Sequence, residues 1–344
     1  MTRLAIVADD LTGALDAAAP FAARGLSTVV ALQVEGLEAA IATGADIVGV
    51  STDSRDIAPE AAREVVAQWV ARLGRVPVFK KVDSRLKGNI AAELDALSFT
   101  RGLAIPAIPA FGRWSRGGKL GGFGVADPID IAARLGPHAA KVSVPDAETD
   151  EDIAEAIAAS DHDLLIGARS LAEALAARMA PDARSAAPPA LAAPAICIIG
   201  STDPITLAQI AMLRDRCPVD FRGAPDGMLL DNGPARAPVT VIQALPGRTG
   251  AESATVANRL ADALLCLAPP EGATLVISGG ATAQIVLHAL DISVLELMGE
   301  ALPGLPIARA GGFTVITKSG GFGQPGALLD LLGNLAGSMQ ESYA

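Results

Sequence analysis

The chain has 344 residues, of which 51% are hydrophobic and 19% are charged, a composition that supplies a large core and excludes a disordered chain. One hydrophobic core rarely organises so many residues, so the length predicts two domains. The formal net charge of -11 argues against nucleic acid as the main partner, because proteins bind phosphate backbones with a surplus of lysine and arginine.

In the first half, apolar runs of strand length alternate with helical patterns, which is typical of a parallel sheet in an α/β fold. The expected strands are residues 4–8, 28–32, 46–50, 76–80, 103–108 and 164–166. The expected helices are residues 15–23, 59–73, 90–97, 150–158 and 171–179. We therefore predict an N-terminal α/β domain over residues 1–180.

Residues 181–194 are mostly alanine and proline and follow no helical or strand period, which predicts a linker. The alternation then resumes, with expected strands at residues 196–199, 239–243, 275–277 and 314–317 and expected helices at 204–214, 251–267, 283–290 and 325–335. Residues 195–344 are thus predicted to form a second domain. The expected fold is two α/β domains with largely parallel sheets that flank a shared active-site cleft.

The expected cellular location follows from two absences in the sequence. The apolar run at residues 4–8 is too short for a secretory signal, and no stretch reaches the roughly 20 apolar residues of a membrane span. The three cysteines and three histidines are scattered, so they predict neither a disulfide framework nor a metal site. The sequence favours a cytoplasmic protein without membrane or nucleic-acid partners and is compatible with a homo-oligomer.

The first expected strand ends in Asp9-Asp10-Leu11-Thr12-Gly13. Ligands of open parallel sheets bind beyond the carboxyl ends of the strands, so these carboxylates are candidates for substrate contact. One could orient a hydroxyl group or take its proton, while the other binds Mg²⁺ or caps the helix. Plain helix capping by Asp10 or Thr12 is the alternative interpretation.

Residues 80–89 follow another expected strand and concentrate charge. They combine cations with a carboxylate and hydrogen-bonding groups, namely Lys80, Lys81, Arg85, Lys87, Asp83, Ser84 and Asn89. Such a set suits a small carboxylate that bears hydroxyl groups, and a solvated charged loop is the alternative. Arg55 offers a bidentate clamp for a carboxylate, and Arg113 begins a glycine-bearing loop or hairpin that could close over the same site.

Three glycine-rich turns in the second half each follow an expected strand. They are residues 200–202, 278–282 and 318–323, and Lys318 adds a cation to the third. Bare backbone N–H groups with an ammonium are the chemistry of a phosphate site. No turn has P-loop spacing or a dinucleotide fingerprint in its expected context. Each alone is equally typical of a tight turn, but together they favour phosphate binding.

Six segments in this order, DDLTGA, KKVDSRLKGN, PAIPAFGR, GSTDPITLAQI, SGGATA and KSGGFG, resemble the four-carbon acid sugar kinase family over nearly the whole chain. The resemblance implies ATP-dependent phosphorylation of a hydroxyl group on a sugar acid such as threonate, erythronate or an oxo-tetronate, with Mg²⁺ assisting. It also implies that the N-terminal domain binds the acid and the C-terminal domain binds the nucleotide.

The resemblance makes Asp10, Arg55 and residues 81–84 contacts of the acid. With the charged and polar neighbours of those residues, the predicted acid site is Asp9, Asp10, Arg55, Lys81, Val82, Asp83, Ser84, Lys87, Asn89 and Arg113. The predicted ATP site is Ser201, Gly279, Gly280, Ala281, Thr282, Gly320 and Gly321. Asp10 is the first candidate for the general base and Asp83 the second, while Lys318 is expected to offset phosphate charge.

Ala281 stands where most members of the family are expected to carry a carboxylate. A catalytically weak or silent sensor of an acid metabolite or nucleotide is therefore the alternative function. The kinase is preferred because Asp10, Arg55, Asp83 and Lys318 occur together, which a sensor does not need. A dehydrogenase is disfavoured because the chain lacks a dinucleotide fingerprint.

Overall fold

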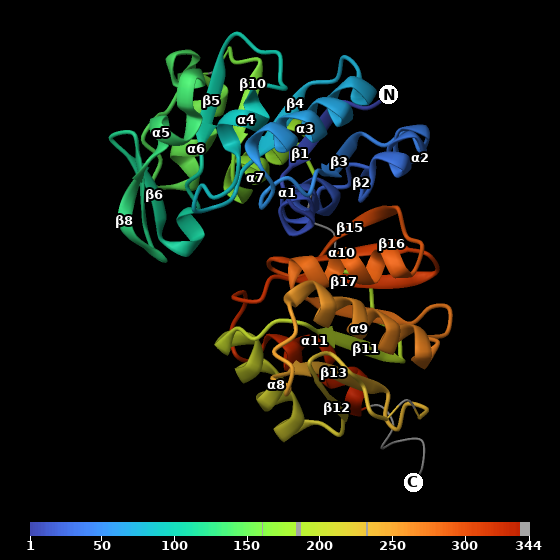
Figure 1. Cartoon of the computed structure of the whole chain (residues 1–344). Coiled ribbons are helices and arrows are strands. Elements are labelled where there is room, and N and C mark those ends of the chain that lie inside the picture. Colours follow the sequence, from blue (N-terminus) through green and yellow to red (C-terminus); the bar gives the residue numbers. More distant parts are fainter. Residues whose placement is uncertain (160, 184–186, 232, 338–344) are drawn as a thin grey trace. The chain divides into compact units, whose positions relative to one another are not determined.

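The computed structural model describes residues 1–159, 161–183, 187–231 and 233–337. The chain divides into two compact units, Met1–Ala186 and Ala187–Ala344. Figure 1 shows that each unit mixes helices with strands, which confirms the predicted α/β class. Residues 184–186 of the predicted linker lie outside the described residues.

The first unit is built on a parallel sheet. Its strands are β1 (Leu4–Ala8), β2 (Thr28–Ala31), β3 (Ile47–Ser51), β4 (Val78–Lys81), β5 (Gly102–Ile105), β9 (Val142–Ser143) and β10 (Leu164–Gly167). Its α-helices are α1 (Leu11–Ala23), α2 (Leu37–Ala42), α3 (Pro59–Leu73), α4 (Ile90–Leu94), α5 (Ile131–Leu135), α6 (Asp150–Ala158) and α7 (Arg169–Met179). β1, β2 and β3 are buried along their whole length, as strands covered on both faces require.

The strands of this sheet lie in the order β2-β3-β1-β4-β10-β5-β9. The chain builds β2 and β3 on one side of β1 and then crosses to place β4 on the other side. Such a reversal is a topological switch point, where the loops after neighbouring strands diverge and leave a crevice for a ligand. The loops after β3, β1 and β4 meet at this point.

The segment from Arg113 onward forms a small antiparallel sheet. Its strands are β6 (Arg113–Arg116), β7 (Lys119–Gly122) and β8 (Val125–Asp130). The sequence predicted only a loop or hairpin here. Gly122 explains the tight return, because its φ is +101° and a Cβ on it would lie 2.1 Å from the Gly112 carbonyl oxygen.

The second unit has a mixed sheet. Its strands are β11 (Ala195–Ile199), β12 (Asp220–Pro225), β13 (Val239–Leu245), β14 (Thr274–Ser278), β15 (Val294–Leu302), β16 (Leu305–Ala310) and β17 (Phe313–Lys318). They lie in the order β12-β13-β11-β14-β17-β16-β15. The strands β12, β13, β11, β14 and β17 are parallel to one another, and β16 is antiparallel to its neighbours β17 and β15. Its helices are α8 (Pro204–Arg216), α9 (Ser253–Leu267), α10 (Gly280–Ala289) and α11 (Ala327–Gly337).

The sequence missed several elements of both units, among them α2, α5, β9, β12, β15 and β16. In β12 the apolar run is interrupted by Asp220 and Arg222, whose side chains form a buried ion pair at 2.7 Å. In β15 and β16 the alternation is interrupted by Gly299 and Pro306. α10 begins at Gly280, earlier than the predicted residue 283, so most residues of the second glycine turn, 278–282, belong to its first helical turn.

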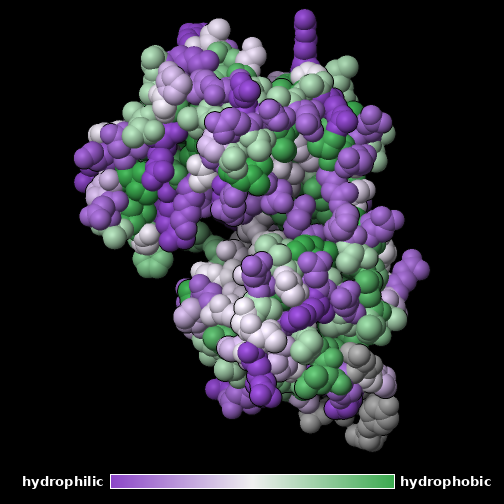
Figure 2. Space-filling model, in the orientation of Figure 1, coloured by the Kyte–Doolittle hydropathy of each residue, from purple (hydrophilic) through white to green (hydrophobic). Residues whose placement is uncertain are grey.

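No helix among the described residues is both long and apolar enough to cross a membrane. Figure 2 shows hydrophilic residues spread over the visible face of both units, with smaller hydrophobic patches between them.

Candidate active site

Three loops at the switch point of the first unit carry most of the predicted contacts of the acid. Asp9 and Asp10 follow β1, residues 52–55 follow β3, and residues 82–89 follow β4. Because β3, β1 and β4 are parallel neighbours, their carboxyl ends bring the three loops to one edge of the sheet.

Arg55 binds both adjacent carboxylates. Its Nε and Nη2 each donate to an oxygen of Asp9 at 2.8 Å, and its Nη1 donates to Asp10 Oδ2 at 2.6 Å. We expected this fork to clamp the carboxylate of a substrate. In the structure Asp9 occupies the fork, so Arg55 holds the carboxylate pair in place, and its contact with the acid stays a prediction.

Asp10 is the more accessible carboxylate of the pair, with 25% of its side chain exposed against 2% for Asp9. It is the N-cap of α1, and its Oδ1 accepts a hydrogen bond from the N–H of Gly13 at 2.7 Å. The capping interpretation is therefore confirmed for Asp10. Capping leaves lone pairs on both oxygens, so it does not prevent Asp10 from meeting a substrate hydroxyl group.

The two carboxylates differ in acidity. Burial by itself raises the pKa of Asp9, but the Arg55 hydrogen bond and the charges of Lys80, Arg55 and Lys81 hold that pKa below its usual value. Burial raises the pKa of Asp10, the Asp9 charge acts in the same direction, and Arg55 opposes both without reversing them. Asp10 is thus the better proton acceptor of the two.

Lys81 places a buried ammonium beside Asp10. Its Nζ donates to the Val82 carbonyl at 2.9 Å, and an ammonium has two further donors. A Cβ built on Gly13 would lie 2.6 Å from Asp10 Oδ1 and 3.4 Å from Lys81 Nζ. Glycine at this position therefore lets the carboxylate and the ammonium approach the start of α1 together.

Asp83 organises the loop after β4. Its Oδ1 accepts hydrogen bonds from the N–H groups of Arg85 at 2.8 Å and Lys87 at 3.3 Å, which closes a tight turn. Its Oδ2 lies 4.0 Å from Arg55 Nη1. Asp83 therefore lies beside the carboxylate pair, whereas the side chain of Lys87 is exposed.

Asn89 joins this loop to the loop after β3. Its Nδ2 donates to the carbonyls of Ser54 and Ile57, each at 2.8 Å. These bonds give Asn89 a structural role in place of the predicted contact with the acid. Beside it, Gly88 has a φ of +88°, and a Cβ on it would lie 2.9 Å from Asp9 Oδ2, so the loop passes very close to that carboxylate.

Arg113 begins β6, and backbone carbonyls bind its guanidinium. Nε and Nη2 donate to the Phe123 carbonyl at 3.2 and 3.0 Å, and Nη1 donates to the Ser84 carbonyl at 3.2 Å. Burial and the like charge of Arg85 lower the pKa of Arg113. Arg113 thus fastens the small antiparallel sheet to the loop after β4.

A buried ion pair that the sequence did not predict supports these loops. Lys80 Nζ lies 2.8 Å from Glu93 Oε2, and both side chains are fully buried. Ser54 Oγ donates to the other oxygen of Glu93, and the hydroxyls of Ser54 and Thr52 are 2.6 Å apart. Lys80, which we expected among the cations facing a substrate, is therefore a core residue that fixes the loop after β3.

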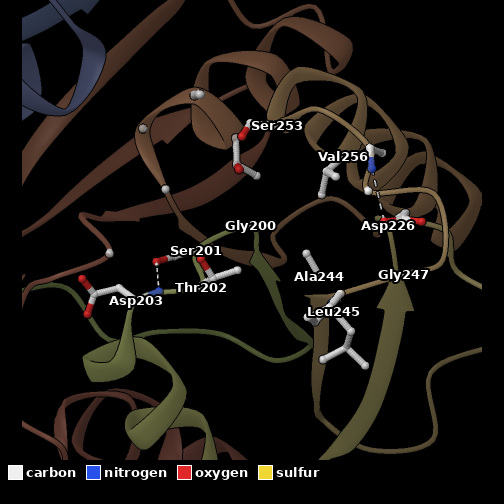
Figure 3. Close-up of a pocket in the computed structure, with 18 of the residues that line it drawn as sticks. Gly200, Ser201, Thr202, Asp203, Asp226, Ala244, Leu245, Gly247, Ser253 and Val256 are labelled. Atoms are coloured by element: carbon white, nitrogen blue, oxygen red, sulfur yellow. Dashed lines mark hydrogen bonds between the residues drawn. The ribbon is translucent and has the colours of Figure 1, made fainter.

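The second unit contains a cavity of about 850 Å³ at the carboxyl ends of its parallel strands. Figure 3 shows the residues after β11 on one side of it and the end of β13 on the other. Among its lining residues are the predicted nucleotide contacts Ser201, Gly279, Gly280, Ala281, Thr282 and Gly320. Gly321 is not part of the lining.

The three glycine turns meet in this cavity. A Cβ on Gly200 would lie 2.0 Å from Thr282 Oγ1, and a Cβ on Gly320 would lie 2.3 Å from Ser201 Oγ. Gly279 has a φ of +109° and precedes the first residue of α10. Glycine at these positions lets the turns approach one another closely, and the first residues of α10 line the cavity, so a helix N-terminus, which attracts anions, lies beside it.

Lys318 does not face this cavity. Its buried Nζ donates to Thr206 Oγ1 at 2.8 Å and to the carbonyls of Ser319 and Gly320, both at 3.0 Å. All three ammonium donors are thereby used, so the geometry contradicts the predicted phosphate contact. Burial lowers the pKa of Lys318 to about 8, although the Asp203 charge opposes the change.

The lining residues of the cavity include two carboxylates and no cationic side chain. Asp203 is the N-cap of α8, where its Oδ1 accepts from the Ile205 N–H at 2.8 Å. Asp226 accepts from the N–H and the hydroxyl of Thr249 at 2.9 and 2.6 Å, and these bonds lower its pKa. A Cβ on Gly247 would lie 2.2 Å from the Asp226 carboxylate, so the loop after β13 is closed tightly on Asp226.

Sequence reasoning missed Asp226. The available signal was the Asp226-Gly227 pair directly after a strand, because this dipeptide marks turns with positive φ. In the structure both residues have positive φ, 49° and 81°.

The sequence also matches two models of known protein domains. A sugar-binding N-terminal domain model matches residues 4–126, and a nucleotide-binding C-terminal domain model matches residues 226–328. The D-threonate kinase of Cupriavidus necator is 31% identical to this chain, over 94% of this chain and 95% of that protein. The chain belongs to the four-carbon acid sugar kinase family. The 3-oxo-tetronate kinase of Pseudomonas fluorescens is 27% identical over 97% of both chains.

Members of this sugar-acid kinase family therefore match the chain almost end to end, although their named substrates differ. A crystal structure of a Haemophilus influenzae protein shares the fold, with a TM-score of 0.69 and 22% identity over 96% of this chain and all of that one. The first family model includes the loops after β1, β3 and β4, and the second includes the cavity wall from Asp226 to Gly320. Residues 200–204, which line the cavity, lie outside both models.

Proposed function

We propose that this chain is an ATP-dependent kinase that phosphorylates a hydroxyl group of a four-carbon or closely related sugar acid, such as threonate, erythronate or an oxo-tetronate. One observation carries the proposal. The first unit has a site with paired carboxylates at the switch point of its sheet. The second unit has a glycine-lined cavity at the carboxyl ends of its own parallel strands. The acids named for the relatives supply the substrate class.

In the acid site, Asp10 is the proposed general base. It is the exposed member of the carboxylate pair, and its raised pKa brings it closer to neutral pH, where a base accepts a proton most effectively. Lys81 supplies donors for the carboxylate or hydroxyl groups of the acid. Arg55 is a positioning residue, because its fork fixes Asp9 and thereby orients Asp10.

In the nucleotide site, phosphates are proposed to bind the glycine turns and the N-termini of α8 and α10. The lining carries no cationic side chain, and backbone N–H groups and a metal ion are proposed to balance the phosphate charge. The donor set fits Mg²⁺, which is commonly held by one or two carboxylates together with substrate phosphates. Asp203 is the carboxylate closest in sequence to the glycine turns, and Mg²⁺ would lower the barrier by neutralising charge on the transferred phosphoryl group.

A catalytically silent sensor is the second candidate function. It is favoured by Ala281 in the cavity wall and by the engagement of Lys318 outside the cavity. A sensor would bind nucleotide or acid without turnover.

Release of ADP tests the proposal directly. Wild-type protein is incubated with ATP, Mg²⁺ and each of a panel of four-carbon sugar acids, their oxo forms and a few five- and six-carbon acids. The kinase requires acid-dependent ADP release with at least one of them, and loss of that release when EDTA removes Mg²⁺. Tight binding of ATP without turnover on any acid would support the sensor.

A further inference from the structure

The loop after β3 contains a residue in the left-handed region of backbone conformation. Asp53 has a φ of +50°, which is uncommon for a residue with a side chain and persists where neighbouring contacts hold the turn. Asp53 itself is exposed, whereas Thr52 before it and Ser54 after it are buried. The two neighbours therefore hold this turn, and Arg55 follows them directly in the chain.

Every polar group of Ser54 has a partner. Its N–H donates to the Asp9 carbonyl at 3.0 Å, and its own carbonyl accepts from Asn89 Nδ2 at 2.8 Å. Its hydroxyl donates to the Glu93 carboxylate and lies 2.6 Å from the hydroxyl of Thr52. Ser54 thus joins the loop after β3 to the loops after β1 and β4 at one buried point.

The partners of the Ser54 hydroxyl are themselves attached to strand ends of the sheet. Glu93 is held by Lys80 of β4 at 2.8 Å. The N–H and the hydroxyl of Thr52 both donate to the carbonyl of Ala8, the last residue of β1, at 2.9 and 3.0 Å. The hydroxyl of Ser54 is therefore connected on both sides to the rigid part of the first unit.

Ser54 and Arg55 hold Asp9 from two directions. The Ser54 N–H binds the carbonyl of Asp9, and the Arg55 fork binds its carboxylate at 2.8 Å through each of two nitrogens. The remaining guanidinium nitrogen of Arg55 binds Asp10 at 2.6 Å. Because Ser54 and Arg55 are consecutive, a displacement of Ser54 moves the fork relative to both carboxylates.

We infer that Ser54 is a positioning residue of the acid site, which joins the three loops and thereby sets the Arg55 fork against Asp9 and the proposed base Asp10. The inference rests on the proposed kinase function and deepens it. Ser54 is fully buried, so it acts through Arg55 and not by contact with the substrate. Loss of its hydroxyl slows the chemical step rather than weakening the acid, because a small misplacement of a reacting group lowers the rate steeply.

Steady-state kinetics of Ser54→Ala test the inference. Alanine keeps the backbone bonds to Asp9 and Asn89 and removes the hydroxyl that binds Glu93. We expect kcat to fall about 10- to 100-fold, while the KM values for the acid and for ATP stay within about threefold of wild type.

Ser51→Ala is the matched control. Ser51 is the last residue of β3 and is also buried, but its hydroxyl has no hydrogen-bond partner among the residues that the structure describes. This variant is expected to keep the wild-type kcat.

Thr52→Val is a second variant, which decides the question if Ser54→Ala does not fold. Valine keeps the shape of threonine and removes the hydroxyl that contacts both Ser54 and the Ala8 carbonyl. It is expected to lower kcat in the same way, again with little change in the two KM values.

The pKa of Asp10 gives a readout that needs no turnover. Burial raises this pKa, Arg55 and Lys81 lower it, and Asp9 raises it; Asp83 is the further charge beside Arg55. A loosened Arg55 contact should therefore move the pKa of Asp10 upward in Ser54→Ala and leave it unchanged in Ser51→Ala. Titration by ¹³C NMR of protein labelled at the aspartate carboxyl carbon measures it, with the Asp10 resonance assigned by its loss in Asp10→Asn.

Three outcomes would overturn the inference. They are a wild-type kcat and Asp10 pKa in Ser54→Ala, an equal loss of kcat in Ser51→Ala, and a rise in the KM for the acid with kcat unchanged. Failure of every acid as a substrate would refute the kinase, whereas the titration of Asp10 would still decide whether Ser54 positions it.

Discussion

The guanidinium of Arg55 binds the carboxylate of Asp9 through two hydrogen bonds of 2.8 Å each. This pair turns a buried carboxylate, which would otherwise be costly, into a fixed support for the accessible Asp10 next to it. The site of the first unit therefore depends on an internal ion pair as much as on groups that can reach a substrate.

Arg55→Lys tests that dependence. A lysine ammonium replaces a planar fork, so Asp9 loses one of two parallel bonds and Asp10 loses its partner. We expect kcat to fall roughly 10- to 100-fold through misplacement of Asp10, with a smaller rise in the KM for the acid. Steady-state kinetics distinguish the roles, because a rise in KM alone would mean that Arg55 binds the substrate directly.

Asp10→Asn tests the general base. Asparagine is as good an N-cap as aspartate, so α1 keeps its capping bond while the proton acceptor is lost. Turnover should drop about 10²- to 10⁴-fold with little change in affinity for the acid. A modest fall in thermal stability should accompany it, because the amide has one oxygen and cannot accept from both the Gly13 N–H and Arg55. Turnover close to the wild-type value would exclude Asp10 as the base and leave Asp83 as the candidate.

Loss of one partner of the buried Lys80–Glu93 ion pair is expected to destabilise the first unit. Lys80→Met leaves a buried carboxylate without its cation, which should lower the free energy of unfolding by about 3–5 kcal/mol. The double variant Lys80→Met/Glu93→Leu removes both charges and should recover much of that loss. Chemical denaturation of wild type, of the single variants Lys80→Met and Glu93→Leu and of the double variant measures the coupling, and purely additive effects would contradict it.

Gly320→Ala tests the meeting of the glycine turns. Its Cβ would collide with Ser201 Oγ, so one of the two must move, and we expect ATP affinity to fall roughly 5- to 100-fold. Gly326→Ala is the matched control, since its Cβ would lie no closer than 3.6 Å to any neighbour, the Asp330 carboxylate, and Gly326 does not line the cavity. Similar affinities of the two variants would remove the Gly320 turn from the nucleotide site.

Lys318 gives the second unit a pH dependence. Its pKa of about 8 lies below the ordinary 10.5, so between these values the unfolded chain holds a proton that the folded protein has lost. The free energy of unfolding should therefore rise with pH over this interval in wild type relative to Lys318→Met. Parallel pH profiles of the two proteins from pH 7 to 10.5 would contradict the lowered pKa.

The sequence predicted where many of the helices, strands and site loops lie, but it did not predict which residues the charged side chains bind. The loops after β1, β3 and β4 and the three glycine turns were all identified from strand-then-polar segments, because that signal is local. The partners of Arg55 and Lys318 were not, since Asp9 lies 46 residues from Arg55 and Thr206 lies 112 residues from Lys318. Only the fold shows that these cations are already engaged.

The same limit applies to Glu93 and Asp226. Glu93 lies in a short helix and has no motif around it, yet it is fully buried against Lys80. Asp226 follows β12, whose apolar pattern is interrupted by Asp220 and Arg222. Its hydrogen-bond partner Thr249 lies more than twenty residues further along the chain. Burial and pairing, rather than residue type, reveal both residues.

The most direct test of the account is ³¹P NMR of the product formed from ATP, Mg²⁺ and the acid that releases ADP fastest. The account predicts a phosphate ester on a hydroxyl carbon of the acid, seen as a phosphorus resonance coupled to a carbon-bound proton, and its absence from the Asp10→Asn reaction over the same time. Formation of inorganic phosphate alone, or of an acyl phosphate on the carboxylate, would contradict it.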